Sequence, residues 1–408
     1  KEEGEIQGII HGRSKWKLDL EKRAFDCALF KINETRYIWF LNMHHLVTDA
    51  ISATIVYKRV VAIYSSLEQG EPEGYTNFPQ YTTYVDFEQR QHLEERSSEI
   101  QEYWENKASA GSEQPVFFGR KPGNSVTEAT RVSLKLGKER TEKLKALAKR
   151  PEIRSWTHNL TLFNLLATVF FTYLHRISGQ NRMRIGAPAH NRLNKSLSET
   201  VGLFIEIFPL EAEFCEDDTF NSLLQRLKIE ANQYLRYAQP GSVTPKISGS
   251  FNVILNFINA SFSDFDGRPM KSEWLHTGHI DITHQIRCHV VDFDNRGDIE
   301  LLFDLNHGTF SQDLIHKVPL HFLNLLDAFF EDPNQSVYAP SMLDTIGEEP
   351  ATTLGADSDH RNTVIDEFKI QAVSNPVAPC LRFKSETTSY GELDGLSDRL
   401  ASFLLENG

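Results

Sequence analysis

Near its start the chain alternates apolar and polar residues with a period of two, and it changes to a helical period soon afterwards. Residues 24–32 alternate as a half-buried strand does, and 37–41 (YIWFL) form an apolar run typical of a fully buried strand. From Ile51 onward, apolar side chains recur at helical spacing as far as Gly70, which predicts an amphipathic helix. Residues 42–50 therefore form a strand-to-helix connection, a position that often carries functional side chains.

Predicted helices and strands continue to mix through the middle of the chain. The charged segment 81–107 is typical of an exposed amphipathic helix. Residues 160–174 form a run of 15 uncharged residues. Because a bilayer span needs about 20 residues, this run predicts a buried core helix. Further strands are predicted at 131–136, 182–189, 201–210, 251–258, 286–293 and 299–305, and further helices at 138–149, 220–237 and 311–330. The last two strands flank 294–298 (DNRGD), whose turn residues predict a hairpin. This mixture predicts an α/β (α+β) fold with mixed sheets and flanking helices.

The last part of the chain differs in pattern from the rest. Residues 344–362 are polar and lack periodicity, which predicts a linker. Residues 363–408 predict a helix, a short strand and a final helix that begins at the capping box of Ser389 and Glu392. The final helix is expected to turn its apolar side chains inward: Leu393, Leu396, Leu400, Phe403 and Leu404. Because so short a segment rarely builds a stable core, we expect a truncated domain here.

Composition narrows the class of protein. The 408 residues carry a formal net charge of −13, which disfavours binding to nucleic acid. Four cysteines lie far apart without a C-x-x-C pair, which favours neither a disulfide framework nor a thiolate zinc site and indicates a cytoplasmic protein. The first residues contain neither an initiator Met nor an apolar signal segment, and no membrane span is expected. We expect the chain to come from within a larger protein.

The strand-to-helix connection contains two adjacent histidines and an aspartate. Asp49 directly precedes the helix, and an N-cap or a structural ion pair explains it as well as a catalytic role does. His44 and His45 point to opposite faces if the strand stays extended, which disfavours a shared metal ion. A histidine can accept a proton near neutral pH. Since the chain has no G-x-S-x-G motif, direct transfer between two bound substrates is favoured over a covalent intermediate.

Four segments resemble motifs of one enzyme family. Residues 43–52 (MHHLVTDAIS) resemble the HHxxxDG signature of condensation domains in nonribosomal peptide synthetases. Residues 84–87 (YVDF) resemble the family's Y-x-D-[FY] segment, and 186–192 (GAPAHNR) with 201–206 (VGLFIE) resemble its G-x-P-x-x-x-R and [IV]-G-x-F-V-N segments. The order along the chain is also that of the family.

This resemblance implies a domain organisation. The fold would be a two-lobed chloramphenicol acetyltransferase-like fold with a tunnel between its lobes. Residues 1–80 would be the C-terminal part of a first lobe that is truncated at its N-terminus, and 81–343 would be the second lobe. After the linker, 363–368 (TVIDEF) and 389–393 (SYGEL) resemble the opening of an adenylation domain, so 363–408 would be its truncated N-terminus.

The resemblance also implies the chemistry and the partners. An acceptor amine on one phosphopantetheine arm would attack a donor thioester on another, with both arms delivered by peptidyl carrier domains. His45 would orient or deprotonate the amine, and His44 would be structural. Asp49 would be held by an ion pair with Arg192, and Gly202 would lend its backbone to the tunnel. No metal and no directly bound cofactor are implied.

Several positions depart from the family pattern. Ala50 replaces the Gly that follows the family's aspartate, and it would be strained by about 1 kcal/mol if that position needs a positive φ. Glu206 replaces an Asn and would place a carboxylate near the tunnel. Residues 238–241 (AQPG) replace a family H-Q-D-x-P-F-E run. These departures keep open the hypothesis of a non-catalytic condensation-like domain that recruits or spaces its partner domains.

Other candidates are weaker. A free-standing acyltransferase that uses coenzyme A is disfavoured by the segment that resembles an adenylation domain. Four histidines gather late in the sequence: His276, His279, His284 and His289. Their spacing matches no zinc signature, so a loop entering a strand is the favoured interpretation.

Overall fold

The computed structural model describes residues 3–70, 78–92, 96–109, 114–118, 126–293, 297–342, 364–383 and 386–407. The chain divides into two compact units, Lys1–Asp344 and Thr345–Gly408. The linker predicted at 344–362 lies outside the described residues.

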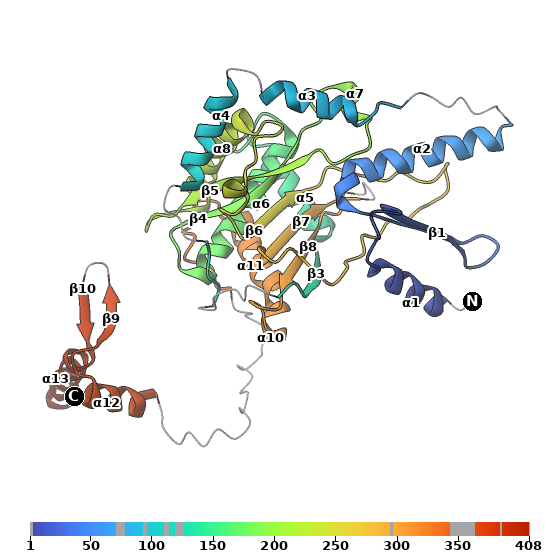
Figure 1. Ribbon diagram of the computed structural model, residues 1–408. Helices are drawn as coiled ribbons and strands as arrows, with labels where there is room; N and C mark the ends of the chain where they lie inside the picture. Colours follow the sequence, from blue (N-terminus) through green and yellow to red (C-terminus); the bar gives the residue numbers. More distant parts are fainter. Residues whose placement is uncertain are drawn as a thin grey trace. The chain divides into compact units, whose positions relative to one another are not determined.

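A six-stranded mixed sheet forms the centre of the first unit (Figure 1). Its strands lie in the order β3-β8-β7-β6-β4-β5. Their bounds are β3 Ala129–Lys135, β4 Arg182–His190, β5 Ile205–Glu213, β6 Val253–Phe257, β7 Ile286–Val291 and β8 Glu300–Asn306. β4, β6 and β7 are parallel to one another, while β5, β8 and β3 each pair antiparallel with a neighbour. The predicted mixed α/β architecture is confirmed, and β7 and β8 pair as the predicted hairpin does.

Helices and strands together bury the main apolar core on one face of this sheet. The long helices are α5 Gly137–Ala148, α6 His158–Ser178, α8 Phe220–Tyr237 and α11 Lys317–Glu331. Their apolar side chains join those of alternate strand positions such as Ile185, Leu255 and Phe303 in one cluster. Among the described residues, α6 is long and apolar enough to cross a membrane, but 78% of its most apolar window is buried inside the protein. The predicted core helix is confirmed.

Further helices border the sheet. Instead of one helix over 81–107, the structure has α3 Thr82–His92 and α4 Arg96–Ser109. α4 buries Trp104 completely, and the indole Nε1 donates to the Tyr237 carbonyl at 2.8 Å. The predicted helix 311–330 is likewise two helices, because the short α10 Gln312–Ile315 precedes α11. Two other short helices are α7 Lys195–Ser198 and α9 Pro245–Ser248.

A smaller group of elements comes from the start of the chain. These are α1 Glu3–Ser14, β1 Phe25–Lys31, β2 Tyr37–Met43 and α2 Ala50–Glu68, with β1 and β2 paired antiparallel as a separate two-stranded sheet. Ile6, Ile10 and Phe40 form its small core. The prediction that 37–41 is a fully buried strand is wrong, since Phe40 alone in β2 is buried. A two-stranded sheet with one covering helix cannot bury both of its faces.

The face of α2 that is buried differs from the apolar face expected from the sequence. Its buried residues are Ser52, Thr54 and Tyr57. Residues 258–285, between the parallel strands β6 and β7, reach this helix: the Tyr57 hydroxyl donates to the Ser263 carbonyl at 2.5 Å. Tyr57 also makes ring contacts with Phe262 and Phe265. Thus α2 docks through hydrogen bonds and ring contacts to distant chain segments, which an apolar periodicity cannot reveal.

The other face of the six-stranded sheet is polar. Arg131 of β3 donates two hydrogen bonds, at 2.6 and 2.8 Å, to the carboxylate of Asp304 on β8. His289 of β7 lies 3.3 Å from the same carboxylate. Next to it, Arg287 Nη2 lies 2.8 Å from Nδ1 of the buried His284. This charged cluster is buried, so its carboxylate and guanidinium groups depend on one another for pairing.

The second unit contains α12 Val364–Ser374, β9 Pro379–Phe383, β10 Glu386–Ser389 and α13 Tyr390–Asn407. The predicted capping box is present, since Ser389 N donates to Glu392 Oε2 at 2.8 Å and Glu392 N donates to Ser389 Oγ at 3.4 Å. The prediction that the apolar side chains of α13 point inward is wrong for four of them. These exposed side chains are Leu396, Leu400, Phe403 and Leu404. Two helices and a hairpin have too little surface to cover them.

The buried histidines predict a loss of stability in acid. Burial lowers the pKa of His276 and His284 to about 4, whereas an unfolded histidine titrates near 6.5. Between these values the unfolded chain binds protons that the folded chain does not. Stability is therefore fully present above about pH 6.5 and falls as the pH approaches 4. Urea unfolding is expected to show a lower midpoint at about pH 5 than at about pH 7.5.

A variant separates this effect from general acid sensitivity. In His284→Gln the new amide oxygen can still accept from Arg287 but does not titrate in this range. We expect a smaller difference between the two midpoints in this variant. The matched control is His11→Gln, at an exposed site on α1, which should keep the original difference. An equal difference between the two urea midpoints in His284→Gln and in the unmodified chain would contradict the assignment of this acid effect to His284.

Candidate active site

The dihistidine lies on the connection from β2 to α2, as the sequence predicts. β2 ends at Met43, a short 3₁₀ turn covers His45–Val47, and α2 begins at Ala50. His44 caps this turn, because its Nδ1 accepts a hydrogen bond from the Leu46 backbone N–H at 3.2 Å. The His45 side chain is exposed. The two histidines therefore differ in role: His44 shapes the turn, and His45 is open to a ligand.

Asp49 is buried and fully engaged. Its Oδ1 accepts from the Ser52 backbone N–H at 2.7 Å, which makes Asp49 the N-cap of α2. Its two oxygens also lie 2.9 and 3.0 Å from Arg192 Nη2, and Oδ2 accepts from the Phe204 backbone N–H at 3.2 Å. Asp49 is therefore both an N-cap and a member of an ion pair, and the predicted partner Arg192 is confirmed.

Arg192 joins this aspartate to the loop that follows β4. Its Nη1 donates to the carbonyls of Leu197 and Thr200 at 2.8 and 2.7 Å, and its Nη2 also donates to Ser52 Oγ at 2.8 Å. The guanidinium lies over the Phe204 ring, 3.9 Å from the ring centroid. The side chains of the ion pair are 4% and 0% exposed, so water does not screen their attraction.

Gly202 makes a close contact between α2 and this loop. Its backbone N–H donates to Ser52 Oγ at 3.0 Å, and its carbonyl accepts from the same hydroxyl at 2.8 Å. A Cβ at this position would lie 2.0 Å from Tyr81 Cδ2. The Tyr81 hydroxyl in turn donates to the Leu203 carbonyl at 2.5 Å, which fixes the ring in place. A glycine is needed here because the space of a side chain is already filled.

The strain expected at Ala50 is absent. Ala50 is the first residue of α2, and among the described residues a positive φ without glycine occurs at Phe118 and Asp266. The Ala50 methyl packs on a small apolar cluster of Ile258, Ala260, Val291 and Leu302. Strain is expected only if this position needs a positive φ, and that condition is not met, because Ala50 has the backbone of a helix start and not of a left-handed turn.

Glu206 is held by backbone groups of the segment that departs from the family pattern. Its carboxylate accepts from the backbone N–H groups of Gly241 and Val243 at 2.7 and 3.3 Å, and from Asn191 Nδ2 at 2.9 Å. Burial raises the pKa of this carboxyl group. The observed contacts give Glu206 a structural task, which is to tie β5 to residues 238–243.

The histidines late in the sequence do not converge on one point. His276 and His289 lie beside Asp304, His284 lies beside Arg287, and His279 lies 3.1 Å from Thr127 Oγ1. Within the described ranges, no group of three or more His, Cys, Asp or Glu side chains is placed to share a metal ion.

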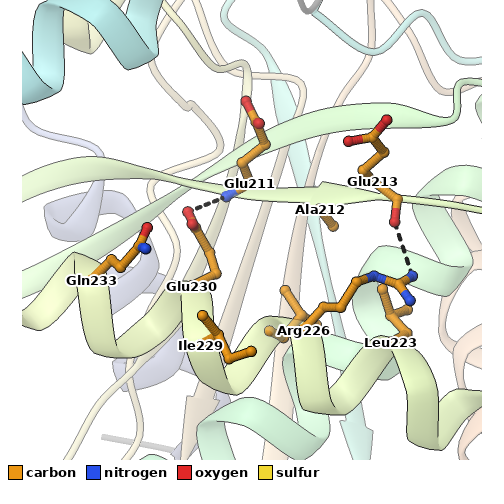
Figure 2. Close-up of a pocket in the computed structure, with 9 residues that line it drawn as sticks. Glu211, Ala212, Glu213, Leu223, Arg226, Ile229, Glu230 and Gln233 are labelled. Atoms are coloured by element: carbon orange, nitrogen blue, oxygen red, sulfur yellow. Dashed lines mark hydrogen bonds between the residues drawn. The ribbon is translucent and has the colours of Figure 1, made fainter.

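A cavity of about 180 Å³ lies between β5 and α8 (Figure 2). Glu230 accepts from the Glu211 backbone N–H at 3.0 Å, and Arg226 donates to the Glu213 carbonyl at 3.0 Å. Because β5 is an edge strand, these contacts occupy backbone groups that another strand could otherwise pair with. The dihistidine does not line this cavity. We assign the side chains that do line it to protection of the edge of the sheet.

Comparison with known proteins identifies the family. Residues 1–349 match the condensation-domain family, so the chain belongs to the condensation domains of nonribosomal peptide synthetases. These are acyltransferase-type domains that form peptide bonds.

The chain is 24% identical over 420 residues to surfactin synthase subunit 1 of Bacillus subtilis, covering 96% of the chain and 11% of that protein. It is also 24% identical over 403 residues to the nonribosomal peptide synthetase TES of Alternaria alternata, covering 92% of the chain and 8% of that protein. The chain thus spans about a tenth of the length of these relatives.

Solved structures establish the same fold. The first condensation domain of the CDA synthetase superposes with a TM-score of 0.70 at 19% identity, covering 84% of this chain and 75% of that one. The X-domain from teicoplanin biosynthesis superposes with a TM-score of 0.69 at 16% identity, covering 84% and 80%. The predicted fold class is therefore confirmed as that of condensation domains.

We expect Asp49→Ala to destabilise the first unit strongly. The substitution removes the N-cap and leaves the Arg192 guanidinium buried without its carboxylate. Breaking a buried ion pair costs about 3–5 kcal/mol. Asp49→Asn keeps a capping oxygen and should lose less than Asp49→Ala. The free energy of unfolding in urea measures both. Asp217→Ala, at an exposed site, is the control. If Asp49→Ala lowers the free energy of unfolding as little as this control does, the structural role of the Asp49–Arg192 ion pair is contradicted.

Gly202→Ala should also destabilise the protein, by about 1–3 kcal/mol, because the added methyl group overlaps the Tyr81 ring. Gly8→Ala provides the matched control. Gly8 lies within α1, has no heavy atom within 4 Å of a built Cβ, and should gain about 0.5–1 kcal/mol from helix propensity. Thermal unfolding of the two variants compares them directly. A melting temperature of Gly202→Ala equal to that of the unmodified chain would show that Tyr81 moves aside without cost.

Proposed function

We propose that this condensation domain forms an amide bond by attack of a carrier-bound acceptor amine on a carrier-bound donor thioester. The observation that supports this most is the placement of His45. The imidazole is exposed, and it lies on a connection whose end is anchored by the buried Asp49–Arg192 ion pair. An exposed base on a rigid support meets the geometric requirement of proton transfer to or from a bound substrate.

The proposed reaction needs no covalent enzyme intermediate. The amine lone pair forms a bond to the thioester carbonyl carbon, and the bond from that carbon to sulfur breaks. The nitrogen loses one proton, which His45 accepts and then gives to the departing thiolate, so that the imidazole ends neutral. The products are an amide and a free thiol. Orientation of two bound arms supplies a large part of such catalysis, since it replaces a bimolecular encounter.

The other residues of the HHxxxDG-like segment, and the residues after β4 that contact it, have supporting roles in this proposal. His44 shapes the turn through its bond to the Leu46 backbone. Asp49 and Arg192 hold the helix start, and Gly202 allows the close approach of the loop after β4. The Ala50 methyl takes the space of the family's glycine hydrogen without a backbone penalty. None of these five residues needs to contact the substrates.

The partners follow from the reaction. We propose donor and acceptor peptidyl carrier domains, whose phosphopantetheine arms bring the thioesters, and an adjacent adenylation domain that residues 363–408 begin. The exposed leucines and phenylalanine of α13 support the last point, because they offer an apolar face to further chain. We propose a cytoplasmic location, which the scattered cysteines support.

His45→Ala is expected to lower the rate of dipeptide formation by about 10²–10⁴-fold, the range typical of a general base. The assay supplies the full chain with two purified carrier proteins, one loaded with an N-acetylated aminoacyl group and one with an unprotected aminoacyl group, and detects the product by mass spectrometry. Since His45 is exposed, the melting temperature should stay unchanged.

The control for this experiment is His11→Ala, an exposed histidine on α1. It should keep the full rate. A full rate in His45→Ala would show that this histidine takes no part in the chemistry. If the unmodified chain makes no product from any loaded pair, the alternative of a non-catalytic domain that recruits or spaces partners is favoured instead.

A further inference from the structure

A line of hydrogen-bonded side chains crosses the polar face of the six-stranded sheet. It runs from Arg131 on β3 to Asp304 on β8, then to His289 on β7 and to Asn256 on β6. His289 Nε2 lies 3.3 Å from Asp304 Oδ2, and Asn256 Nδ2 lies 3.3 Å from His289 Nδ1. The four residues come from four adjacent strands, so the sheet itself holds their spacing.

The chemistry of the line determines the direction of each hydrogen bond. Burial raises the pKa of Asp304, but the hydrogen bonds from Arg131 and His289 outweigh this effect and hold the pKa below its usual range, so the carboxylate only accepts. His289 must therefore carry its proton on Nε2. Burial lowers the pKa of His289, so its ring is neutral and its Nδ1 is an acceptor. Asn256 must then turn its NH₂ group toward His289, and its amide oxygen points away from the line.

This amide oxygen has no partner. Asn256 Oδ1 is buried and accepts no hydrogen bond, which costs about 1–3 kcal/mol. Nearby, His190 of β4 bonds the backbone of Phe257 and leaves its own buried Nδ1 without a partner. Two unsatisfied acceptors thus lie close to the carboxyl ends of the parallel strands β4 and β6. Together they favour a ligand that brings hydrogen-bond donors.

The start of α2 packs on the same face of the sheet. Ala50 contacts the cluster of Ile258, Val291 and Leu302, and each of these is two residues from a member of the line. The connection that carries His45 therefore ends against a cluster that includes Ile258, two residues beyond Asn256 along the chain. A substrate group held by Asn256 would lie at the edge of the candidate active site.

From this geometry we propose that Asn256 binds the acceptor substrate by accepting a hydrogen bond from its amino group, and that His289, Asp304 and Arg131 position the Asn256 amide for this task. The inference rests on the proposed amide-forming function. An attacking amine gains positive charge on nitrogen, which an amide oxygen stabilises, and an N–H···O bond aims the lone pair. The ligand class is thus a primary aminoacyl thioester.

Kinetics with the full chain and the two loaded carriers test the binding role. Asn256→Ala should raise the acceptor KM and lower the acceptor kcat/KM by about 10–100-fold, as the loss of one positioned hydrogen bond does. The donor KM should not change. Asn324→Ala is the matched control, because Asn324 lies on α11 and donates to the Met342 carbonyl. It should leave both KM values unchanged.

Nuclear magnetic resonance tests the positioning role without turnover. The ¹⁵N shifts of His289 should show a neutral ring with its proton on Nε2. The Asn256 side-chain amide signal should move on addition of glycyl-N-acetylcysteamine thioester and stay in place with the acetyl thioester, which lacks the amine. A proton on His289 Nδ1, or equal responses to the two thioesters, would overturn the inference.

The outcomes separate the two proposals. If dipeptide forms and depends on His45 while Asn256→Ala keeps the acceptor constants, the proposed function stands and the role of Asn256 is refuted. If the unmodified chain forms no dipeptide, the proposed function fails, and the glycyl and acetyl thioester comparison still decides whether Asn256 binds an amino group. Circular dichroism and the melting temperature of Asn256→Ala show that a loss of activity does not come from unfolding.

Discussion

The ion pair between Asp49 and Arg192 is the contact on which the geometry of the site depends. A buried ion pair loses the solvation of two charges, and its attraction offsets this loss only when the remaining donors and acceptors are also bonded. Here the carboxylate takes further bonds from the Ser52 and Phe204 backbone, and the two terminal nitrogens of the guanidinium donate to carbonyls and to Ser52 Oγ, which leaves Nε as its one buried donor without a partner. One interaction thus ties the start of α2 to the loop after β4, and the connection that holds His45 ends at this tie.

Local structure could be predicted from the sequence wherever one short stretch decides it. The core helix α6, the hairpin of β7 and β8 and the capping box at Ser389 follow from spacing within a few residues. The burial of β2 could not be predicted, because it depends on how many strands join the sheet. The buried face of α2 could not be predicted either. Its contacts are made to segments more than a hundred residues away, such as the hydrogen bond from Ser52 to Gly202 and the ring contact of Tyr57 with Phe262.

The residues of the candidate site likewise divide into those that the sequence could reveal and those that it could not. His45, Asp49 and Arg192 could be found because they lie in motifs, and a motif also indicated that the last two would pair. Asn256 could not be found, because nothing in its own segment marks it. Its amide is oriented by a histidine on the next strand, and that histidine is oriented by an aspartate one strand further. Such a dependence exists only once strands distant in sequence are adjacent in space.

The two faces of the six-stranded sheet are under different constraints. One face carries the apolar side chains that the helices cover, and it can tolerate exchange among residues of similar volume. The other face carries charges in a dry environment, where each group depends on its neighbour's protonation state. Arg131 balances Asp304, so His289 can stay neutral and present an acceptor to Asn256. The polar face therefore bears on stability through its buried ion pair and, under the proposal for Asn256, on the orientation of that amide through the same groups.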